Sequence, residues 1–157
     1  MTAIVCHPLY SIFASSSEDS SIRIWDSETA QFERSLKGHT GIVTGLAFNP
    51  KGQLLVSASA DMTAKIWDMN SFTCTKTLKG HDHSLAEVKF TLSGDHIITC
   101  SRDQTIKMWD SNTGFCVKTF SNGHSDWIKC ISMSLDGLYM ASSGLDQVIV
   151  QSASESA

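Results

Sequence analysis

The sequence has 157 residues, of which 41% are hydrophobic and 18% are charged, a size and composition that suit about one domain with its own core. Twelve lysines and arginines against sixteen acidic residues give a net charge of −4, which argues against a broad surface for DNA or RNA. No run of about 18 apolar residues predicts a membrane span and no segment resembles a signal peptide, so we expect a cytoplasmic protein.

Short apolar or alternating runs, bounded by Gly, Asn, Asp or Ser, follow one another along the chain. Residues 1–26 hold three such runs, and each of the stretches 32–68, 74–110 and 116–151 holds four. Short runs with flanking turn residues predict β-strands, and no stretch shows a helical period. We therefore predict an all-β chain that ends in a polar tail at 152–157.

The strand pattern is tied to a sequence repeat of 42 to 43 residues. Trp-Asp pairs begin at Trp25, Trp67 and Trp109, and Gly-His pairs and a lone aspartate recur at the same interval. The landmark histidines are His39, His81 and His124, and the landmark aspartates are Asp19, Asp61, Asp103 and Asp146. Four short strands per repeat of this length are the sequence pattern of a β-propeller blade.

Because several landmarks recur in register, the chain resembles the WD-repeat family over nearly its whole length. The strand count predicts an incomplete WD-repeat β-propeller over residues 1–151, with about 3.75 four-stranded blades. Propellers of this family usually have about seven blades, so we expect part of a larger ring. A closed ring of four blades is the alternative.

In the WD-repeat family the landmark histidine and aspartate, a strand serine or threonine, and the tryptophan form a hydrogen-bonded network within one blade. The resemblance places His39, Asp61 and Trp67 in one network, with Ser57 or Ser59 as the hydroxyl. The further members are His81, Asp103 and Trp109 with Thr99 or Ser101, then His124 and Asp146 with Ser152 at the tryptophan position, and Asp19 and Trp25 in the first repeat.

The same residue types occur in Ser-His-Asp catalytic triads. A catalytic centre needs one preorganised site, whereas these residues recur in every repeat, and the sequence has no Gly-x-Ser-x-Gly motif. We therefore expect a structural network and no enzyme activity.

Cysteines and clustered histidines give no sign of a metal site. The five cysteines are odd in number and form no Cys-x-x-Cys pair, so we expect reduced and mostly buried thiols. His81, Asp82 and His83 lie together without a further ligand at metal spacing. We expect no metal and no other cofactor.

Longer segments within the repeats resemble the lissencephaly-1 family from about residue 4 to 149. These segments are 32–40, 57–63, 79–83, 94–97, 101–109 and 114–120. The resemblance implies a non-enzymatic scaffold that binds the cytoplasmic dynein motor domain and dynein adaptors, and also catalytic subunits of platelet-activating factor acetylhydrolase. It implies roles in microtubule-based transport, nuclear migration and spindle or centrosome positioning. The family's dimerisation segment precedes the propeller, and this sequence is expected to lack it.

Three residues of neighbouring repeats are the predicted partner-binding residues. Arg102, Trp127 and Lys129 place a tryptophan beside two cations, a combination that resembles an interface hot spot. The resemblance supports this choice, because Arg102 and Lys129 match positions at which the family places dynein-contacting arginines, with lysine replacing arginine at 129. Solvated turn charges and a half-buried packing tryptophan are the alternative interpretation.

Two other functional classes stay open at this point. One is a generic WD-repeat adaptor, such as a ubiquitin-ligase substrate receptor or a chromatin subunit. The other is a truncated chain without a function of its own.

Overall fold

The computed structural model describes residues 1–146 and 148–152. Within these ranges the chain forms strands and turns and no helix, which confirms the all-β prediction. The strands are β1 (Ala3–Cys6), β2 (Ile12–Ser16), β3 (Ile22–Asp26), β4 (Phe32–Leu36), β5 (Val43–Phe48), β6 (Leu54–Ser59), β7 (Thr63–Asp68), β8 (Thr73–Lys79), β9 (Leu85–Phe90), β10 (His96–Ser101), β11 (Ile106–Asp110), β12 (Cys116–Phe120), β13 (Ile128–Met133), β14 (Tyr139–Gly144) and β15 (Val148–Ser152).

The strands form four antiparallel sheets, each a simple up-and-down meander. Three sheets have four strands, β1 to β4, β5 to β8 and β9 to β12, and the fourth contains β13, β14 and β15 in the described part of the chain. The first strand of every sheet packs beside the first strand of the next, so that β1, β5, β9 and β13 line the inner side of the assembly.

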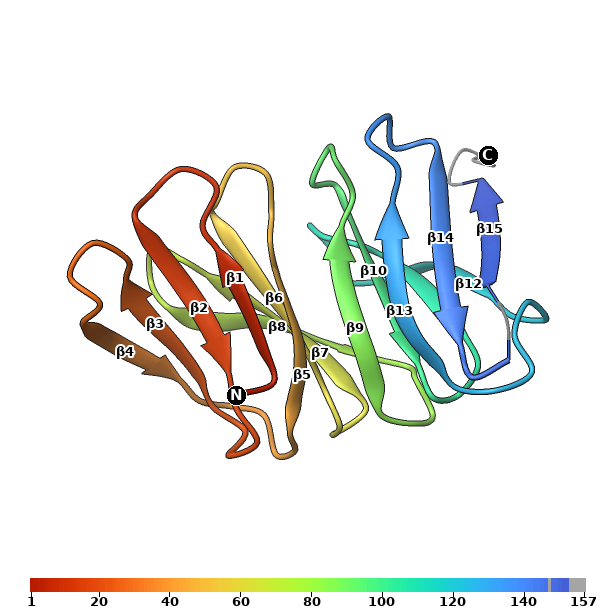
Figure 1. The fold of residues 1–157 in the computed structure, drawn as a ribbon, viewed down its shortest axis with the longest axis horizontal. Coiled ribbons are helices and arrows are strands. Elements are labelled where there is room, and N and C mark those ends of the chain that lie inside the picture. The colour runs from red at the N-terminus through yellow and green to blue at the C-terminus, as the bar shows by residue number, and fades with distance from the viewer. Residues whose placement is uncertain (147, 153–157) are drawn as a thin grey trace.

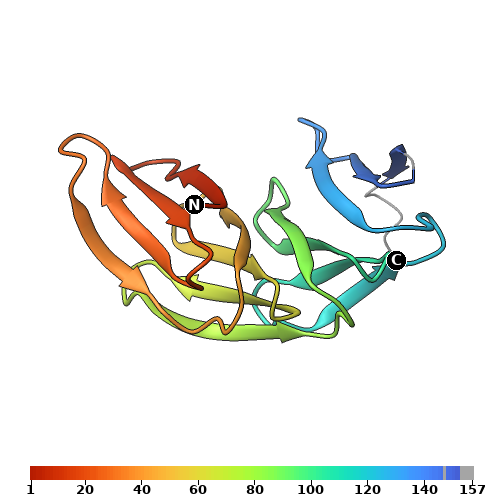
Figure 2. The same ribbon diagram turned by 60° about the horizontal axis from the view of Figure 1, so that its bottom comes forward.

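The sheets stand side by side in an open arc, with the first and fourth sheets at its two ends (Figures 1 and 2). This arrangement confirms an incomplete β-propeller. The described residues form an open arc and do not close into the four-bladed ring that was the alternative. Among the residues that the structure describes there is no helix with the length and apolar character of a membrane span.

The sheets are offset by one strand from the predicted blades. The predicted blades 32–68, 74–110 and 116–151 follow the sequence repeat, but β4, β8 and β12 pair with the preceding strands β3, β7 and β11. The reason lies in the turns. Between β7 and β8 the Asp68 carboxylate accepts the backbone N–H groups of Asn70 and Ser71, which closes a tight hairpin. The longer Gly-His segment then carries the chain to the next sheet.

The end of the chain also differs in part from the predicted tail. Ser152, which the sequence assigns to the polar tail, is the last residue of β15. Residues 153–157 of that tail lie outside the described residues.

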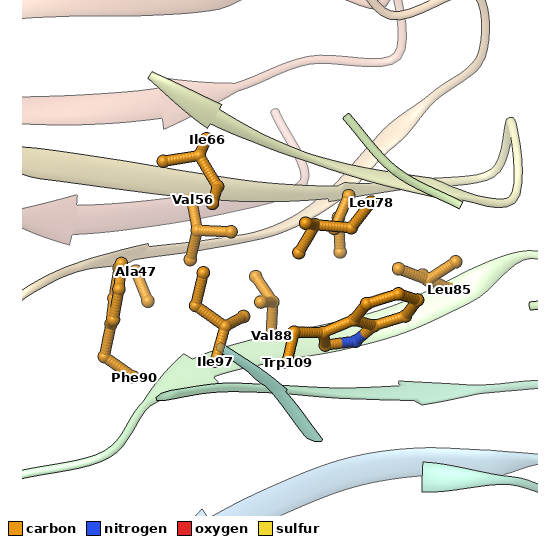
Figure 3. Close-up of a cluster of buried hydrophobic side chains, with 11 residues drawn as sticks. Ala47, Val56, Ile66, Leu78, Leu85, Val88, Phe90, Ile97 and Trp109 are labelled. Atoms are coloured by element: carbon orange, nitrogen blue, oxygen red, sulfur yellow. The ribbon is translucent and has the colours of Figure 1, made fainter. Parts of the chain in front are cut away.

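Apolar side chains fill the space between consecutive sheets. Between the second and third sheets, Val56, Ile66 and Leu78 meet Ile97 and Trp109 (Figure 3). Similar clusters lie between the first and second and between the third and fourth sheets. Burying each large apolar side chain contributes about 1.5–3 kcal/mol, so the inter-sheet layers hold the arc together.

The turns that follow β1 and β5 are joined by a hydrogen bond from His7, a histidine that the sequence analysis did not single out. The buried His7 ring donates from Nε2 to the Gly52 carbonyl, 2.9 Å away, and accepts the N–H groups of Leu9 and Tyr10 at Nδ1. Superposing the repeats would have found this position, because Asn49 caps the corresponding turn of the next sheet by accepting the Leu54 N–H.

Candidate functional site

The second sheet contains a complete polar network. His39 donates from Nδ1 to Asp61 over 2.7 Å, and the hydroxyl of Ser57 lies 2.7 Å from His39 Nε2. Trp67 donates its indole N–H to the same hydroxyl over 2.8 Å. Asp61 also accepts the N–H and hydroxyl of Thr63. The carboxylate therefore joins the Gly-His segment to the turn before β7.

The third sheet repeats this geometry almost atom for atom. His81 lies 2.7 Å from Asp103 through Nδ1 and 2.8 Å from the Thr99 hydroxyl through Nε2, and Trp109 donates to that hydroxyl over 2.9 Å. Of the two hydroxyl alternatives in each repeat, the structure brings Ser57 and Thr99 into the networks. Ser59 and Ser101 instead donate to backbone carbonyls and accept the N–H of the landmark aspartate.

The outer two sheets carry shorter versions of the network. His124 bonds to Asp146 and Ser142, each at 2.8 Å, while the side chain of Ser152 is not among those described. In the first sheet Trp25 donates to Ser15 over 2.8 Å. The Asp19 carboxylate accepts the N–H and the hydroxyl of Ser21 and forms an ion pair with Arg23 at 2.8 Å.

Hydrogen bonding fixes the charge states in the second sheet. Burial alone raises the pKa of Asp61, but hydrogen bonds from Thr63, His39 and the Thr40 amide outweigh it and lower the pKa to about 2. Burial lowers the pKa of His39, and the neighbouring carboxylate opposes this effect without reversing it. A neutral imidazole with its proton on Nδ1 donates to Asp61 and accepts from Ser57, so every polar atom of the network has a partner.

The burial of these groups bears on the comparison with a catalytic triad. Ser57 and Thr99 are fully buried, and each hydroxyl already accepts an indole N–H. A nucleophile must reach its substrate, which these oxygens do not. The arrangement does the structural task of pinning turns against strands.

Arg102, Trp127 and Lys129 surround one hollow of about 220 Å³ between the third and fourth sheets. The Arg102 guanidinium carbon lies 4.7 Å from the centre of the Trp127 ring, a cation–π contact. Leu85 and Ile128 form a buried apolar floor. The structure therefore brings the three predicted residues together on one side of the arc.

His83, which the sequence analysis weighed only as a metal ligand, is a neighbour of this hollow. Its ring centre lies 6.0 Å from that of Trp127, and Ser101 donates to its carbonyl. Among the described residues there is no group of three or more His, Cys, Asp or Glu placed to hold a metal ion. The position of His83 makes it part of the candidate binding surface.

The prediction that the cysteines are mostly buried is wrong, because four of the five are exposed. All five thiols are free, but only Cys100 is buried. Cys74 and Cys116 occupy the outermost strands β8 and β12, where side chains face solvent, so their shared repeat position does not imply burial. Burial raises the pKa of the Cys100 thiol, which keeps it protonated and unreactive.

A family model and several curated relatives match the repeated segments of the chain. The family model for the WD domain, G-beta repeat, matches residues 1–26, 30–68, 72–110 and 114–150. A Lissencephaly-1 homolog of Caenorhabditis briggsae is 57% identical over 149 residues, which are 95% of this chain and 38% of that protein.

Further relatives match shorter stretches. A Lissencephaly-1 homolog of Monosiga brevicollis is 50% identical over 52 residues, 33% of this chain and 13% of that protein. Nuclear distribution protein PAC1-1 of Uncinocarpus reesii is 56% identical over 48 residues, 31% of this chain and 11% of that protein. The chain thus spans well under half the length of these curated relatives.

Proposed function

Since the chain belongs to the WD-repeat family defined by the G-beta repeat, we propose that it is a non-catalytic scaffold of the lissencephaly-1 type that regulates cytoplasmic dynein. The names of its relatives, Lissencephaly-1 homolog and nuclear distribution protein, support this choice over other WD-repeat adaptors. The finer proposals are roles in microtubule-based transport, nuclear migration and spindle or centrosome positioning, carried out in the cytoplasm at microtubules and centrosomes.

The observation that carries the proposal is the grouping of Arg102, Trp127 and Lys129 around one hollow. Aromatic and arginine side chains dominate the binding energy of protein interfaces, especially around a desolvated pocket. Trp127 is 39% exposed, whereas Trp67 and Trp109 are buried. The exposed part of the Trp127 ring is therefore available to a partner. The partners we propose are the dynein motor domain and dynein adaptors, with acetylhydrolase catalytic subunits as a second set.

The proposal is tested by measuring the affinity of the purified chain for a dynein motor domain by biolayer interferometry. We expect Arg102→Ala and Trp127→Ala each to weaken binding at least about tenfold, the usual loss at a hot spot. Arg34→Ala is the matched control, because Arg34 also stacks on an aromatic ring, that of Phe72, but far from the hollow.

Two results would count against the proposal. Equal affinities for the unaltered chain and all variants would mean that dynein does not use this face. Binding to ubiquitin-ligase or chromatin subunits in place of dynein, with the same sensitivity to Arg102, would assign the face to another WD-repeat function.

A further inference from the structure

The hollow beside Trp127 is built by β-bulges. In β5, β9 and β13 the pairing with the next strand shifts by one residue, which leaves Thr44, Ala86 and Lys129 as the extra residues. All three line the hollow. A bulge re-aims a side chain out of the regular alternation of a strand, and bulges are common beside functional sites. The fold thus turns one residue of each of these three inner strands toward the same space.

The three bulge residues differ in whether their side chain forms a hydrogen bond to the next sheet. The Thr44 hydroxyl donates to the Leu85 carbonyl over 2.8 Å and so ties the second sheet to the third. The hydroxyl of Thr2, at the same repeat position, donates to the Val43 carbonyl in the same way. Ala86 has no hydroxyl to make this bond, and its small side chain leaves the space between β9 and β13 open.

The open space has a positive rim. Arg102 and Lys129 line it and are exposed, and among the described residues neither forms an ion pair. Acidic side chains that neighbour the lining residues in the sequence have hydrogen-bond partners of their own, and Asp126 accepts the N–H of Trp127. Asp103 accepts from His81 and Thr105, and Glu87 accepts the Ile131 N–H. Two positive side chains without an ion-pair partner among the described residues thus line the hollow, in a chain whose net charge is −4.

We propose that this hollow binds a phosphorylated serine or threonine side chain of a protein partner. A phosphate ester carries close to two negative charges at neutral pH, which matches one arginine plus one lysine better than a single carboxylate does. The Arg102 guanidinium carbon lies over the Trp127 ring, and a guanidinium held against an aromatic face still has N–H groups to donate to phosphate oxygens. The apolar floor of Leu85 and Ile128 accommodates the methylene or methyl group that carries the phosphate. The proposal rests on the proposed function, because it assigns a ligand to the same face.

The test is an NMR titration of the purified chain with three capped tripeptides, Gly-phosphoSer-Gly, Gly-Ser-Gly and Gly-Glu-Gly. The reporter is the indole N–H of Trp127, assigned with Trp127→Phe. We expect saturable shifts with the phosphopeptide, and binding weaker by at least about tenfold for the other two peptides.

Variants locate the site. Arg102→Gln and Lys129→Gln are expected to weaken phosphopeptide binding about tenfold or more, and Arg34→Gln to leave it unchanged. Ala86→Thr changes no charge and installs the residue that the equivalent bulge already has at Thr44, so it preserves the fold while narrowing the hollow. It is expected to weaken binding by a similar factor.

Each failure has a separate meaning. Equal binding of the glutamate peptide, or no saturable shift with any peptide, overturns the phosphate proposal. If Arg102→Ala nevertheless weakens dynein binding, the proposed function stands without it. If the phosphopeptide binds but dynein affinity ignores Arg102, the phosphate site stands and the dynein assignment falls.

Discussion

The third and fourth sheets carry the same histidine, aspartate and hydroxyl, yet only the third buries a tryptophan over them. In the third sheet Trp109 covers the Thr99 hydroxyl and is 3% exposed. In the fourth, Ser142 bonds to His124 with no tryptophan at the corresponding strand position. The comparison separates two roles: the polar atoms pin the turn, and the indole packs one sheet against the preceding one.

Removing the packed indole of the third sheet should have the largest effect, and removing Trp127, which precedes β13 and does not occupy the landmark position, a much smaller one. Trp109→Ala deletes a buried side chain of the core in Figure 3 and should destabilise the chain by about 3–5 kcal/mol. Trp127→Ala, which removes a half-exposed ring, should cost about 1 kcal/mol or less. Urea unfolding measures both. Equal losses would contradict the division of roles.

Removing the hydroxyl should sharpen the same comparison. Thr99→Val leaves both His81 Nε2 and the Trp109 N–H without a partner in a buried site, so we expect a loss of about 2–3 kcal/mol. Ser142→Ala deprives His124 of one partner and should cost about 1 kcal/mol. If Ser142→Ala costs as much as Thr99→Val, the bond from the Trp109 indole to the Thr99 hydroxyl adds nothing to stability, which would contradict this comparison.

Acid should weaken the network of the second sheet in two steps. The lowered pKa of His39 means that the unfolded chain binds more protons below the ordinary histidine value of 6.5, so stability falls as the pH drops through that value. The lowered pKa of Asp61 stabilises the folded chain above the ordinary value of 3.8, and this contribution is lost as the pH falls toward 2. Thermal unfolding between pH 7 and 2 should show both steps, and Asp61→Asn should make the lower one smaller, because Asp103 of the third sheet, whose pKa is also lowered, contributes to it as well. A free energy of unfolding that rises as the pH falls would contradict the lowered pKa values of His39 and Asp61.

A smaller effect should distinguish the junctions between sheets. The second and third sheets are joined by the Thr44 hydroxyl, and the third and fourth by the Glu87 carboxylate, which accepts the Ile131 N–H over 2.8 Å. Glu87→Gln keeps an acceptor and should cost under about 1 kcal/mol, whereas Glu87→Ala should cost about 1–2 kcal/mol. Amide exchange at Ile131 reports the bond directly, and unchanged exchange in the alanine variant would contradict it.

Much of this architecture follows from spacing alone. The constant interval of 22 residues between His39 and Asp61, and between His81 and Asp103, predicts which side chains meet, because each repeat folds alike. The alternation of side chains along a strand does not say whether Ser57 or Ser59 joins the network, since residues two apart lie on the same face of the strand. The hairpin register decides between them.

Other features have no signal in a linear repeat. A repeat is periodic wherever its boundary is drawn, so the sequence does not say that β4, β8 and β12 belong to the preceding sheets. The bulges at Thr44, Ala86 and Lys129 depend on pairing with the neighbouring strand, which no local pattern encodes. The hollow therefore follows only from the three-dimensional structure, although Arg102, Trp127 and Lys129, which line it, were predicted as partner-binding residues.

Hydrogen–deuterium exchange of the chain, with and without a dynein motor domain, tests the central claim most directly. We expect new protection in residues 84–87, 101–103 and 126–130, which surround the hollow. Protection confined to the turns at the opposite end of the inner strands, residues 7–11, 49–53 and 91–95, would contradict the assignment of the partner-binding face.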